Sequence, residues 1–415
     1  MAKEVVIIGG GIIGLCSAYY MLEKGHKVTI IDKSDMTSGT SYINSGYLSP
    51  SHLIPLSSPG AIKNGLKWML NSSSPLYIKP RLNLDLYKWL FAFVKSSTTK
   101  HVNKSIPLIK EVTLFSQKLY DEIKKKDNFN FHYEKKGLLM LCKTQKYIDE
   151  ESRVVDIAKE NGLIAKMITK EDLKILEPNI EIDAVGASYY NCDSHTTPNE
   201  FMCNMKNYLI KNGVKLIKNT EVTDVNIKNG VIKNLVSNDN KIYADQFVLA
   251  AGSWSSLLSK RLGVKLLLQP GKGYSLNVNR KTNISIPAIL AEAKVAITPM
   301  NGFTRFAGTM EISGINHKIN KSRVRAITQA SKKYYPQLDF TNDEFTNVKC
   351  GLRPVTPDGL PYIGRSSKCK NLIFATGHAM MGWGMGTATG LAVSEILDNK
   401  KTSINIDHYR PDRKF

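Results

Sequence analysis

The sequence contains few cysteines, and they are scattered along the chain. The six stand at positions 16, 142, 192, 203, 350 and 369, and no two of them form a C-x-x-C pair. This spacing predicts neither a disulfide framework nor a zinc site, and it is typical of a protein in a reducing cytoplasm. We therefore expect a cytoplasmic protein without a bound metal.

Long apolar runs are missing as well. No stretch of about 18 or more apolar residues occurs, so the sequence predicts no transmembrane helix. We expect no secretion signal, because a structured motif begins almost at Met1 and a cleaved leader would destroy it. With 415 residues, 42% of them apolar, the chain is long enough for two or three globular domains.

Acidic residues are scarce relative to basic ones. The 36 Asp and Glu residues stand against 57 Lys and Arg, which gives a formal net charge of +21. No helix-turn-helix, zinc-finger or RNA-binding signature accompanies this excess, so we expect no nucleic-acid partner. A basic surface that attracts anionic phospholipid explains the charge, and so does a general preference for lysine at surface positions.

An ordered motif occupies the N-terminus. Its parts are an apolar strand at 5–8, the G-x-G-x-x-G of Gly9, Gly11 and Gly14, a helix at 15–22, a second apolar strand at 28–31, and Asp32. The glycines permit a tight turn and a close approach of pyrophosphate, the helix amides face the phosphates, and the acid lies at a ribose hydroxyl. This order predicts a dinucleotide-binding βαβ unit. The acid disfavours NADP, but the motif alone does not separate NAD from FAD.

Two further stretches are rich in small residues. The loop at 38–50 follows Asp32 and carries many Gly, Ser, Thr and Asn residues, so it is placed to run along an extended cofactor. A purely structural loop has the same composition. The apolar strand at 243–251 ends at the bare Gly252, which repeats the N-terminal pattern and predicts a second approach of the backbone to the cofactor.

The segment 57–97 combines aromatic and basic residues. Trp68, Trp89 and Phe91 are interleaved with lysines such as Lys67 and Lys88. Such an amphipathic basic stretch can lie in a bilayer interface, and it can equally be a helical insertion packed on its own domain. We keep both interpretations open, which allows a peripheral location at the inner face of the cytoplasmic membrane.

The order of the remaining elements predicts an α/β fold with two domains. Short strands recur at 131–142, 186–190 and 214–251, with a hairpin signal at Asn229-Gly230, and strands are again dense over 264–345. We expect a discontinuous Rossmann-type nucleotide-binding domain that is interrupted twice by a second domain with a large mixed or antiparallel sheet. The approximate boundaries are 1–56, 150–265 and 346–415 for the first domain, and 57–149 and 266–345 for the second.

Two late stretches give the chain a recognisable pattern. They are Cys350-Gly-Leu-Arg-Pro-Val-Thr-Pro-Asp-Gly-Leu-Pro-Tyr-Ile-Gly364 and Asn371-Leu-Ile-Phe-Ala-Thr-Gly-His-Ala-Met-Met-Gly-Trp-Gly-Met-Gly386. With the N-terminal motif and the loop Thr40-Ser-Tyr-Ile-Asn-Ser-Gly46, the chain resembles FAD-dependent amine oxidoreductases of the D-amino-acid oxidase superfamily. It is most similar to bacterial D-amino-acid dehydrogenases, whose pattern also matches Leu66-Lys-Trp-Met, Lys88-Trp-Leu, Gly273-Tyr-Ser-Leu and Lys294-Val-Ala-Ile-Thr. The resemblance implies FAD rather than NAD.

The resemblance and the motifs together indicate a cofactor site drawn from five parts of the chain. The expected FAD-binding residues are Gly9, Gly11, Ile12, Ile13, Gly14, Asp32, Lys33, Thr40, Ser41, Asn44, Ser45, Gly46, Val222, Ala251, Gly252, Trp254, Gly377, His378, Met381, Gly382, Trp383 and Gly384. The glycine-rich loop at 377–386 leads into a helix at 387–397, whose positive N-terminus is suited to stabilise the reduced flavin at its N1/C2=O edge. A loop and helix with small residues only for tight packing is the alternative.

Arg353 is the residue expected to bind the substrate. A guanidinium can hold an α-carboxylate with two parallel hydrogen bonds, and the family places its carboxylate-binding arginine in the same Gly-Leu-Arg-Pro context. The alternative is a structural salt bridge. Some oxidases of the family carry a second arginine after Gly-His, but here those positions are Ala379, Met380 and Met381, so the anchor depends on Arg353 alone.

The other candidate catalytic residues are less well defined. Tyr274 can donate a phenolic hydrogen bond to the substrate, or it can be an aromatic residue of the core. His52, His195 and His378 are candidate bases, although a lone histidine more often has a structural role. Hydride transfer from Cα of a neutral amine needs no dedicated base. Cys350 occupies the position at which certain sarcosine-type relatives bind flavin covalently, although a buried unreactive thiol is the usual case.

We therefore expect an FAD-dependent dehydrogenase of a small amino acid. Its substrate would be a D-amino acid or a cyclic imino acid such as a hydroxyproline, hydride would pass from Cα to flavin N5, and a quinone or other carrier would take the electrons. The alternatives are an oxygen-using glycine, sarcosine or D-amino-acid oxidase that makes hydrogen peroxide, and a flavin-carrying electron-transfer subunit of a complex. The sequence indicates no oligomeric state.

Overall fold

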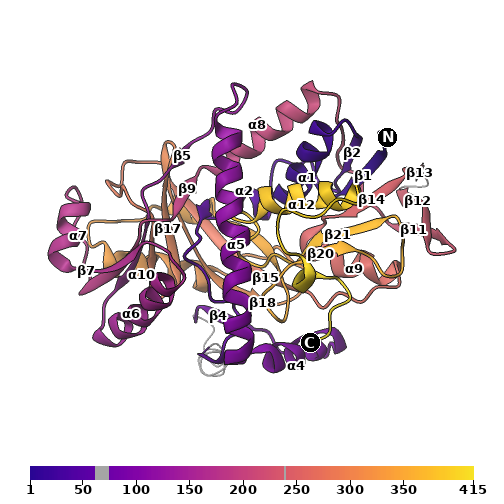
Figure 1. The fold of residues 1–415 in the computed structure, drawn as a ribbon. Helices are drawn as coiled ribbons and strands as arrows, with labels where there is room; N and C mark the ends of the chain where they lie inside the picture. Colours follow the sequence, from indigo (N-terminus) through magenta and orange to yellow (C-terminus); the bar gives the residue numbers. More distant parts are fainter. Residues whose placement is uncertain (61–73, 238–239) are drawn as a thin grey trace.

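The computed structural model describes residues 1–60, 74–237 and 240–415 (Figure 1). Two large sheets lie on either side of the long helix α5 (Thr99–Lys124), which crosses the middle of the view in Figure 1. The apolar face of α5 packs into the core of the nucleotide-binding half, where Ile109 and Val112 are fully buried beside the helix α12 (Gly386–Leu397).

The first sheet has six strands in the order β10-β2-β1-β14-β21-β20. They are β1 (Glu4–Ile8), β2 (Lys27–Ile31), β10 (Lys215–Ile217), β14 (Gln246–Leu249), β20 (Tyr362–Arg365) and β21 (Leu372–Thr376). All are parallel except β20. Their nearly continuous β-branched and apolar runs suit a sheet that is covered on both faces. All five parallel strands therefore end at the same edge, which is where a doubly wound sheet binds its ligand.

Helices cover one face of this sheet and a small sheet covers the other. The helices are α1 (Ile12–Glu23), α8 (Pro198–Lys211) and α12, and the small sheet consists of β11 (Asp224–Lys228), β12 (Val231–Ser237) and β13 (Asn240–Ile242). Helices α1 and α12 pack so closely that a Cβ at Gly390 would lie 2.5 Å from the backbone of Cys16. A side chain at position 390 would therefore force these two helices apart.

The second sheet is larger and mixed. Its strands are β19 (Lys349–Val355), β15 (Gln269–Val278), β18 (Phe303–Ile312), β17 (Val295–Met300), β16 (Ala288–Leu290), β6 (Leu138–Cys142), β8 (Gly186–Tyr190) and β7 (Ala165–Thr169), with β4 (Leu76–Ile78) beside β18. Most neighbours are antiparallel, whereas β16–β6 and β18–β4 are parallel. The helix α10 (Lys321–Tyr334) covers β15 to β18, and α6 (Gln145–Glu160) and α7 (Lys170–Leu176) cover β7 and β8. These two sheets confirm the predicted fold class.

A third, short sheet connects the two halves. Its strands are β3 (Tyr47–Leu48), β9 (Ser194–Thr196) and β5 (Tyr133–Glu134), with β9 in the middle. The remaining short helices are α2 (Thr40–Ile43), α9 (Ser255–Arg261), α11 (Asn342–Thr346) and the 3₁₀ turns Gly252–Trp254 and Asp407–Tyr409. Strand β3 follows α2 after the three residues 44–46, so this sheet supports the loop that the sequence assigns to the cofactor.

Several local predictions are confirmed and others need correction. The Asn229-Gly230 turn forms as predicted, with φ of 55° and 70°. The strand predicted over 131–142 is interrupted at Gly137, whose φ of 73° turns the chain between β5 and β6. The helix α5 begins at Thr99, because the Thr98 side chain accepts a hydrogen bond from the His101 amide, and it accommodates Pro107 in its interior.

Strand pairing also differs from the predicted division into domains. Strands β7 and β8, placed in the nucleotide-binding segment 150–265, pair with each other and with β6 in the large sheet. Strand β19, placed in the segment 346–415, pairs with β15. Conversely, α5 from the segment 57–149 packs against α12. These contacts bury apolar surface between chain segments far apart in sequence, which periodicity does not reveal.

The segment 57–97 is described only in part. The motif Leu66-Lys-Trp-Met and the residue Trp68 lie outside the described residues. The part after 73 contains β4 and the helix α4 (Leu84–Ser96), which lies at the edge of the molecule beside the C-terminus (Figure 1). Among the described helices, none combines the length and the apolar character that a bilayer-spanning helix requires.

Candidate active site

A cavity of about 670 Å³ lies at the carboxyl ends of the parallel strands. It extends from the loop after β1 to the segment after β21, and it reaches Arg353 on the large sheet. Its volume is within the range of roughly 300–1,000 Å³ that is usual for cofactor and ligand sites. The elements that line it come from both halves of the fold.

The glycines after β1 bring the backbone close to neighbouring chain segments. Gly9 has a φ of 113°, and a Cβ there would lie 2.4 Å from the carbonyl oxygen of Ala250. A Cβ at Gly14 would lie 1.9 Å from the carbonyl oxygen of Gly9, so neither position accepts a side chain. Helix α1 begins at Ile12, its N-cap residue Gly11 has no side chain to cap it, and its first turn has no acidic residue. Its positive end is therefore suited to an anionic ligand such as pyrophosphate.

Asp32 lies at the end of β2, on the floor of the cavity. Its Oδ2 accepts a 2.7 Å hydrogen bond from the Gly10 amide, and its Oδ1 accepts from the amide and hydroxyl of Ser34. These bonds fix the carboxylate beside the glycine-rich turn. The cavity wall next to Asp32 contains the Trp254 ring. Lys33 Nζ lies 3.8 Å from the centroid of that ring, and His317 stacks on it.

The loop at 40–46 crosses from the glycine-rich turn to the large sheet. Ser41 Oγ accepts from the Ile12 amide at 2.9 Å, and the Thr40 hydroxyl bonds both main-chain groups of Leu352. The Ser45 carbonyl accepts from Thr298 on β17 at 2.8 Å. Gly46 packs against β9, where a Cβ would lie 2.2 Å from the Thr196 carbonyl oxygen. Ser45 and Gly46 therefore anchor the loop, while Thr40 and Ser41 line the cavity.

The segment after β21 forms the opposite wall. His378 is buried, its Nε2 lies 3.0 Å from the Thr389 hydroxyl of α12, and burial lowers the pKa of its imidazole to about 3. The ring is therefore neutral at physiological pH. Gly382 and Trp383 also line the cavity, and α12 begins shortly afterwards at Gly386 without a side-chain cap.

Arg353 projects from β19 into the other end of the cavity. Its guanidinium lies over Gly273 on β15, where a Cβ would approach Nη1 to 2.1 Å, so this glycine makes room for it. Nη1 donates a 2.9 Å hydrogen bond to the Thr309 carbonyl. Among the described residues, no carboxylate forms an ion pair with Arg353. Burial lowers the pKa of the guanidinium to about 10, which leaves it charged at neutral pH.

Thr309 has an unusual backbone conformation beside this arginine. Its φ is 63°, in the left-handed region that a β-branched residue rarely adopts. Its hydroxyl is buried without a hydrogen-bond partner, and its carbonyl points to Arg353. Strained residues of this kind persist where the surrounding structure holds them, and they concentrate at functional sites.

The structure brings most of the predicted cofactor residues together. Gly9, Gly11, Ile12, Ile13, Asp32, Lys33, Thr40, Ser41, Asn44, Val222, Ala251, Gly252, Trp254, His378, Gly382 and Trp383 line the cavity, as does Arg353. Gly14, Ser45, Gly46, Gly377, Met381 and Gly384 lie behind this lining and shape its loops. Sequence reasoning missed His317, Gly273 and Thr309, because a stacked histidine, a small strand residue and a carbonyl carry no sequence signal.

The remaining candidates lie elsewhere. The Tyr274 hydroxyl donates to Glu311 at 2.7 Å in the core of the large sheet, and His52 is exposed; neither lines the cavity. His195 belongs to a different cluster on β9. The Cys350 thiol lies 3.4 Å from the His317 carbonyl outside the cavity lining, and burial raises its pKa. The structure therefore does not bring Tyr274, His52 or Cys350 together with Arg353.

The residues present fit an extended dinucleotide such as FAD. An uncapped helix end and a glycine turn that excludes any Cβ form one end of the cavity, beside the carboxylate of Asp32. The small residues of the 40–46 loop and the segment after β21 continue the same space toward Arg353. No acidic side chain of the described residues neutralises the guanidinium at that far end.

Comparison with known proteins agrees with this fold. The model of the family described as FAD dependent oxidoreductase matches residues 4–396. The D-amino acid dehydrogenase of Helicobacter pylori is 32% identical over 409 residues, which covers 98% of each chain. The D-amino acid dehydrogenase of Vibrio atlanticus is 30% identical over 414 residues, covering 97% of this chain and 98% of the relative.

Solved structures show the same fold. The glycine oxidase from Geobacillus kaustophilus superposes with a TM-score of 0.80 at 21% identity, covering 100% of this chain and 99% of that one. The L-proline dehydrogenase from P. horikoshii gives a TM-score of 0.76 at 21% identity, covering 99% and 97%. The resemblance drawn from the sequence is thereby confirmed. The family match over nearly the whole length, with a full-length relative at 32% identity, shows that this chain belongs to the FAD-dependent oxidoreductases and uses FAD as its cofactor.

Proposed function

We propose that this enzyme oxidises a small amino acid, either a D-amino acid or a cyclic imino acid such as a hydroxyproline, and passes the electrons to a quinone or another carrier. One observation carries the proposal. The guanidinium of Arg353 lines the cavity, keeps its charge, and has no acidic partner among the described residues. A buried charge without a counter-ion is costly, and the α-carboxylate of a substrate would supply one.

Arg353 would bind and orient the substrate. The Thr309 carbonyl holds Nη1, which leaves the other donors of the guanidinium for a planar carboxylate. Because Gly273 has no side chain, no atom at that position occupies the space of the Arg353 guanidinium. When bound, FAD supplies the two-electron acceptor for the hydride that leaves Cα.

The cavity lining suits a reaction that proceeds without a dedicated base. The neutral His378 is held by Thr389. His317, the other histidine of the lining, stacks on Trp254. His52 and His195 do not line the cavity. A substrate amine that enters in its neutral form can lose hydride directly, and water then hydrolyses the resulting iminium ion. The uncapped N-terminus of α12 follows the cavity segment 378–383, and we infer that its partial positive charge stabilises negative charge at that end.

The exchange Arg353→Met tests the substrate assignment. We expect the variant to retain yellow, bound FAD, because the glycine turn and Asp32 are untouched. Anaerobic bleaching by D-amino acids, L-amino acids, glycine and prolines should fall at least 100-fold in kcat/KM, since a bidentate charge-assisted pair contributes about 3 kcal/mol or more. The matched control is the exposed Arg410→Met. Unchanged bleaching by every amino acid that reduces the wild type would favour an electron-transfer subunit instead.

The electron acceptor needs a separate experiment. We expect the enzyme, once reduced anaerobically by its substrate, to reoxidise slowly in air and rapidly with a soluble quinone. Stopped-flow absorbance of the flavin measures both rates, and a peroxide assay follows the products. Rapid reoxidation in air with stoichiometric hydrogen peroxide would identify an oxidase, the alternative that the glycine oxidase fold keeps open.

A quinone acceptor would place the enzyme at a membrane surface. Helix α4 exposes the side chains of Leu84, Tyr87, Phe91 and Val94 along one stripe, next to the exposed Lys88. Apolar and basic side chains together favour an interface of anionic lipid. All six cysteines are free, which suits the reducing, cytoplasmic side of that membrane. We therefore propose peripheral binding of α4 to the inner face of the cytoplasmic membrane.

A further inference from the structure

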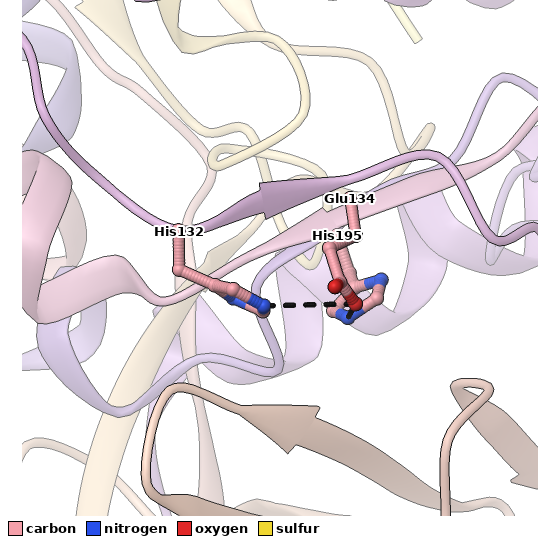
Figure 2. Close-up of side chains that lie close together, drawn as sticks. All are labelled: His132, Glu134 and His195. Atoms are coloured by element: carbon pink, nitrogen blue, oxygen red, sulfur yellow. Dashed lines mark ion pairs between the residues drawn. The ribbon is translucent and has the colours of Figure 1, made fainter.

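The sheet β3–β9–β5 carries a cluster that the proposed reaction does not use. His132, Glu134 and His195 each offer one ligand atom, and these three atoms lie within 4.8 Å of one another. Figure 2 shows the imidazoles and the carboxylate gathered at one place beside the strands. None of these three described residues lines the cofactor cavity.

Strand register explains why the three side chains converge. Glu134 on β5 is the direct cross-strand partner of His195 on β9, so both side chains leave the sheet on the same face. His132 precedes Glu134 by two positions, and alternate residues of an extended segment share a face. The backbone alone therefore presents two imidazoles and a carboxylate to one point.

The distances between the ligand atoms suit a shared ion better than direct hydrogen bonds. Nε2 of His132 lies 3.6 Å from Oε2 of Glu134, and Nε2 of His195 lies 3.5 Å from the same oxygen. These separations exceed a normal N–H···O distance of about 2.9 Å. Ligand atoms about 2.1 Å from a tetrahedral zinc ion stand about 3.4 Å apart, which is close to both values.

His195 is a buried polar group without a hydrogen bond. Its side chain has no exposed surface, and neither Nδ1 nor Nε2 makes a hydrogen bond. Leaving such a group unsatisfied in the interior is costly. An ion between His195 and Glu134 would satisfy it.

The second histidine is oriented for the same role. Nδ1 of His132 lies 3.1 Å from the Thr197 hydroxyl, which fixes the ring and directs Nε2 toward Glu134. Metal-binding histidines are held in this way by a hydrogen bond to the other ring nitrogen. Lys136 competes for the carboxylate at 2.9 Å, but its side chain is 44% exposed and can turn into solvent.

We propose that His132, Glu134 and His195 bind one divalent metal ion of the zinc type, with water in the remaining position. Two imidazoles and one carboxylate are a ligand set that Zn²⁺ accepts. We expected no metal because the sequence has no paired cysteines. That argument does not apply to a site built from histidines on two segments far apart in the sequence.

The ion would stabilise the support of the cofactor loop. Thr196, next to His195, bonds the Gly46 carbonyl through its amide at 2.9 Å and accepts from Trp383 Nε1 at 2.9 Å. Joining β5 to β9 therefore fixes the strand that holds both the 40–46 loop and a residue of the cavity wall. The role inferred is structural, since the cluster does not line the cavity.

Zinc titration of the untagged, flavin-loaded enzyme tests the site. After chelator treatment and dialysis, Zn²⁺ is added against a chromophoric competitor, and the bound metal is counted by mass spectrometry. We expect one equivalent in the wild type, with affinity at least ten-fold lower in both Glu134→Gln and His195→Ala. His408→Ala, which removes a histidine outside the cluster, should bind like the wild type.

Thermal unfolding gives a second measurement that does not depend on activity. Saturating Zn²⁺ should raise the Tm of the wild type and of His408→Ala by about 2 °C or more, and should leave Glu134→Gln unchanged. Glu134 is partly exposed, so this variant is expected to fold even if His195→Ala does not. Equal zinc affinity in wild type and Glu134→Gln, or no retained equivalent in the wild type, would overturn the proposal.

Discussion

Single buried groups without ordinary partners support the two sites proposed for this protein. Arg353 is charged and has no acidic partner among the described residues, and Thr309 beside it holds a left-handed backbone conformation. His195 lacks any hydrogen bond in a different part of the interior. Each such group costs free energy unless a ligand completes it. At the scale of the residue, these costs point to where ligands belong.

Asp193 is a buried residue whose charge has a predictable effect on stability. Its carboxylate accepts from the amide and hydroxyl of Ser51, yet burial raises its pKa to about 6. The folded state therefore holds the proton more tightly than the unfolded state does. The stability that this group contributes is full below about pH 4 and is lost as the pH rises through about 6.

The exchange Asp193→Asn should remove this dependence. Between pH 4 and pH 7 we expect the free energy of unfolding of the variant to rise relative to the wild type by about 2 kcal/mol. Urea unfolding at several pH values measures the difference. The control is Asp127→Asn, which changes an exposed side chain. Its free energy of unfolding should change with pH as that of the wild type does. A difference that stays constant over this pH range would contradict the assignment.

At the scale of elements, α4 has two apolar faces. Leu86 and Trp89 face the interior, and the Trp89 indole donates to the Val355 carbonyl. Phe91 is 74% exposed and Leu84 is 75% exposed on the outer side. The inner face holds the helix on the protein, and the outer face is the one that we propose enters a lipid interface.

The double exchange Leu84→Ser with Phe91→Ser tests that outer face. Binding to vesicles of phosphatidylglycerol and phosphatidylcholine, measured by co-sedimentation, should weaken at least ten-fold, because each apolar side chain contributes roughly 1.5 kcal/mol or more when buried. Ile175→Ser, which removes an apolar side chain that is 77% exposed on α7, is the matched control. Equal binding by the double variant and the wild type would show that α4 does not contact the lipid.

At the scale of the whole molecule, Arg305 joins the two halves. It projects from β18 of the large sheet and is 3% exposed. Its Nη1 donates to the carbonyls of Tyr42 and Asn44 in the cofactor loop, at 2.8 and 2.7 Å, and its Nε donates to Asn277. The position of that loop therefore depends on the other sheet.

Replacing this arginine should loosen the cofactor without touching the cavity. Arg305 does not line the cavity, so Arg305→Met removes the two bonds to the loop and the bond to Asn277 and leaves the cavity lining unchanged. Two lost charge-assisted hydrogen bonds predict a Kd for FAD raised about 10- to 100-fold, measured by flavin fluorescence on dialysis. The exposed Arg410→Met is the control. Normal FAD affinity in Arg305→Met would show that the loop is held by other contacts.

Much of this architecture followed from local patterns in the sequence. The strand, glycines, helix and acid from Glu4 to Asp32 form as predicted, because each step depends on neighbouring residues and on the exclusion of side chains at Gly9 and Gly14. The family motifs led to FAD for the same reason, since they are continuous stretches of chain. The Gly-Leu-Arg-Pro context that singled out Arg353 is likewise a continuous stretch of chain.

Only the tertiary structure decided which distant residues meet. Tyr274 was a reasonable candidate by sequence, but strand register turns its hydroxyl to Glu311, and His195 meets Glu134 because β9 pairs with β5. The division of β7, β8 and α5 between the two halves was likewise set by pairing across long stretches of chain. Local propensity and spacing report on neighbours in sequence, whereas these contacts depend on burial of apolar surface and on register between segments that the sequence keeps far apart.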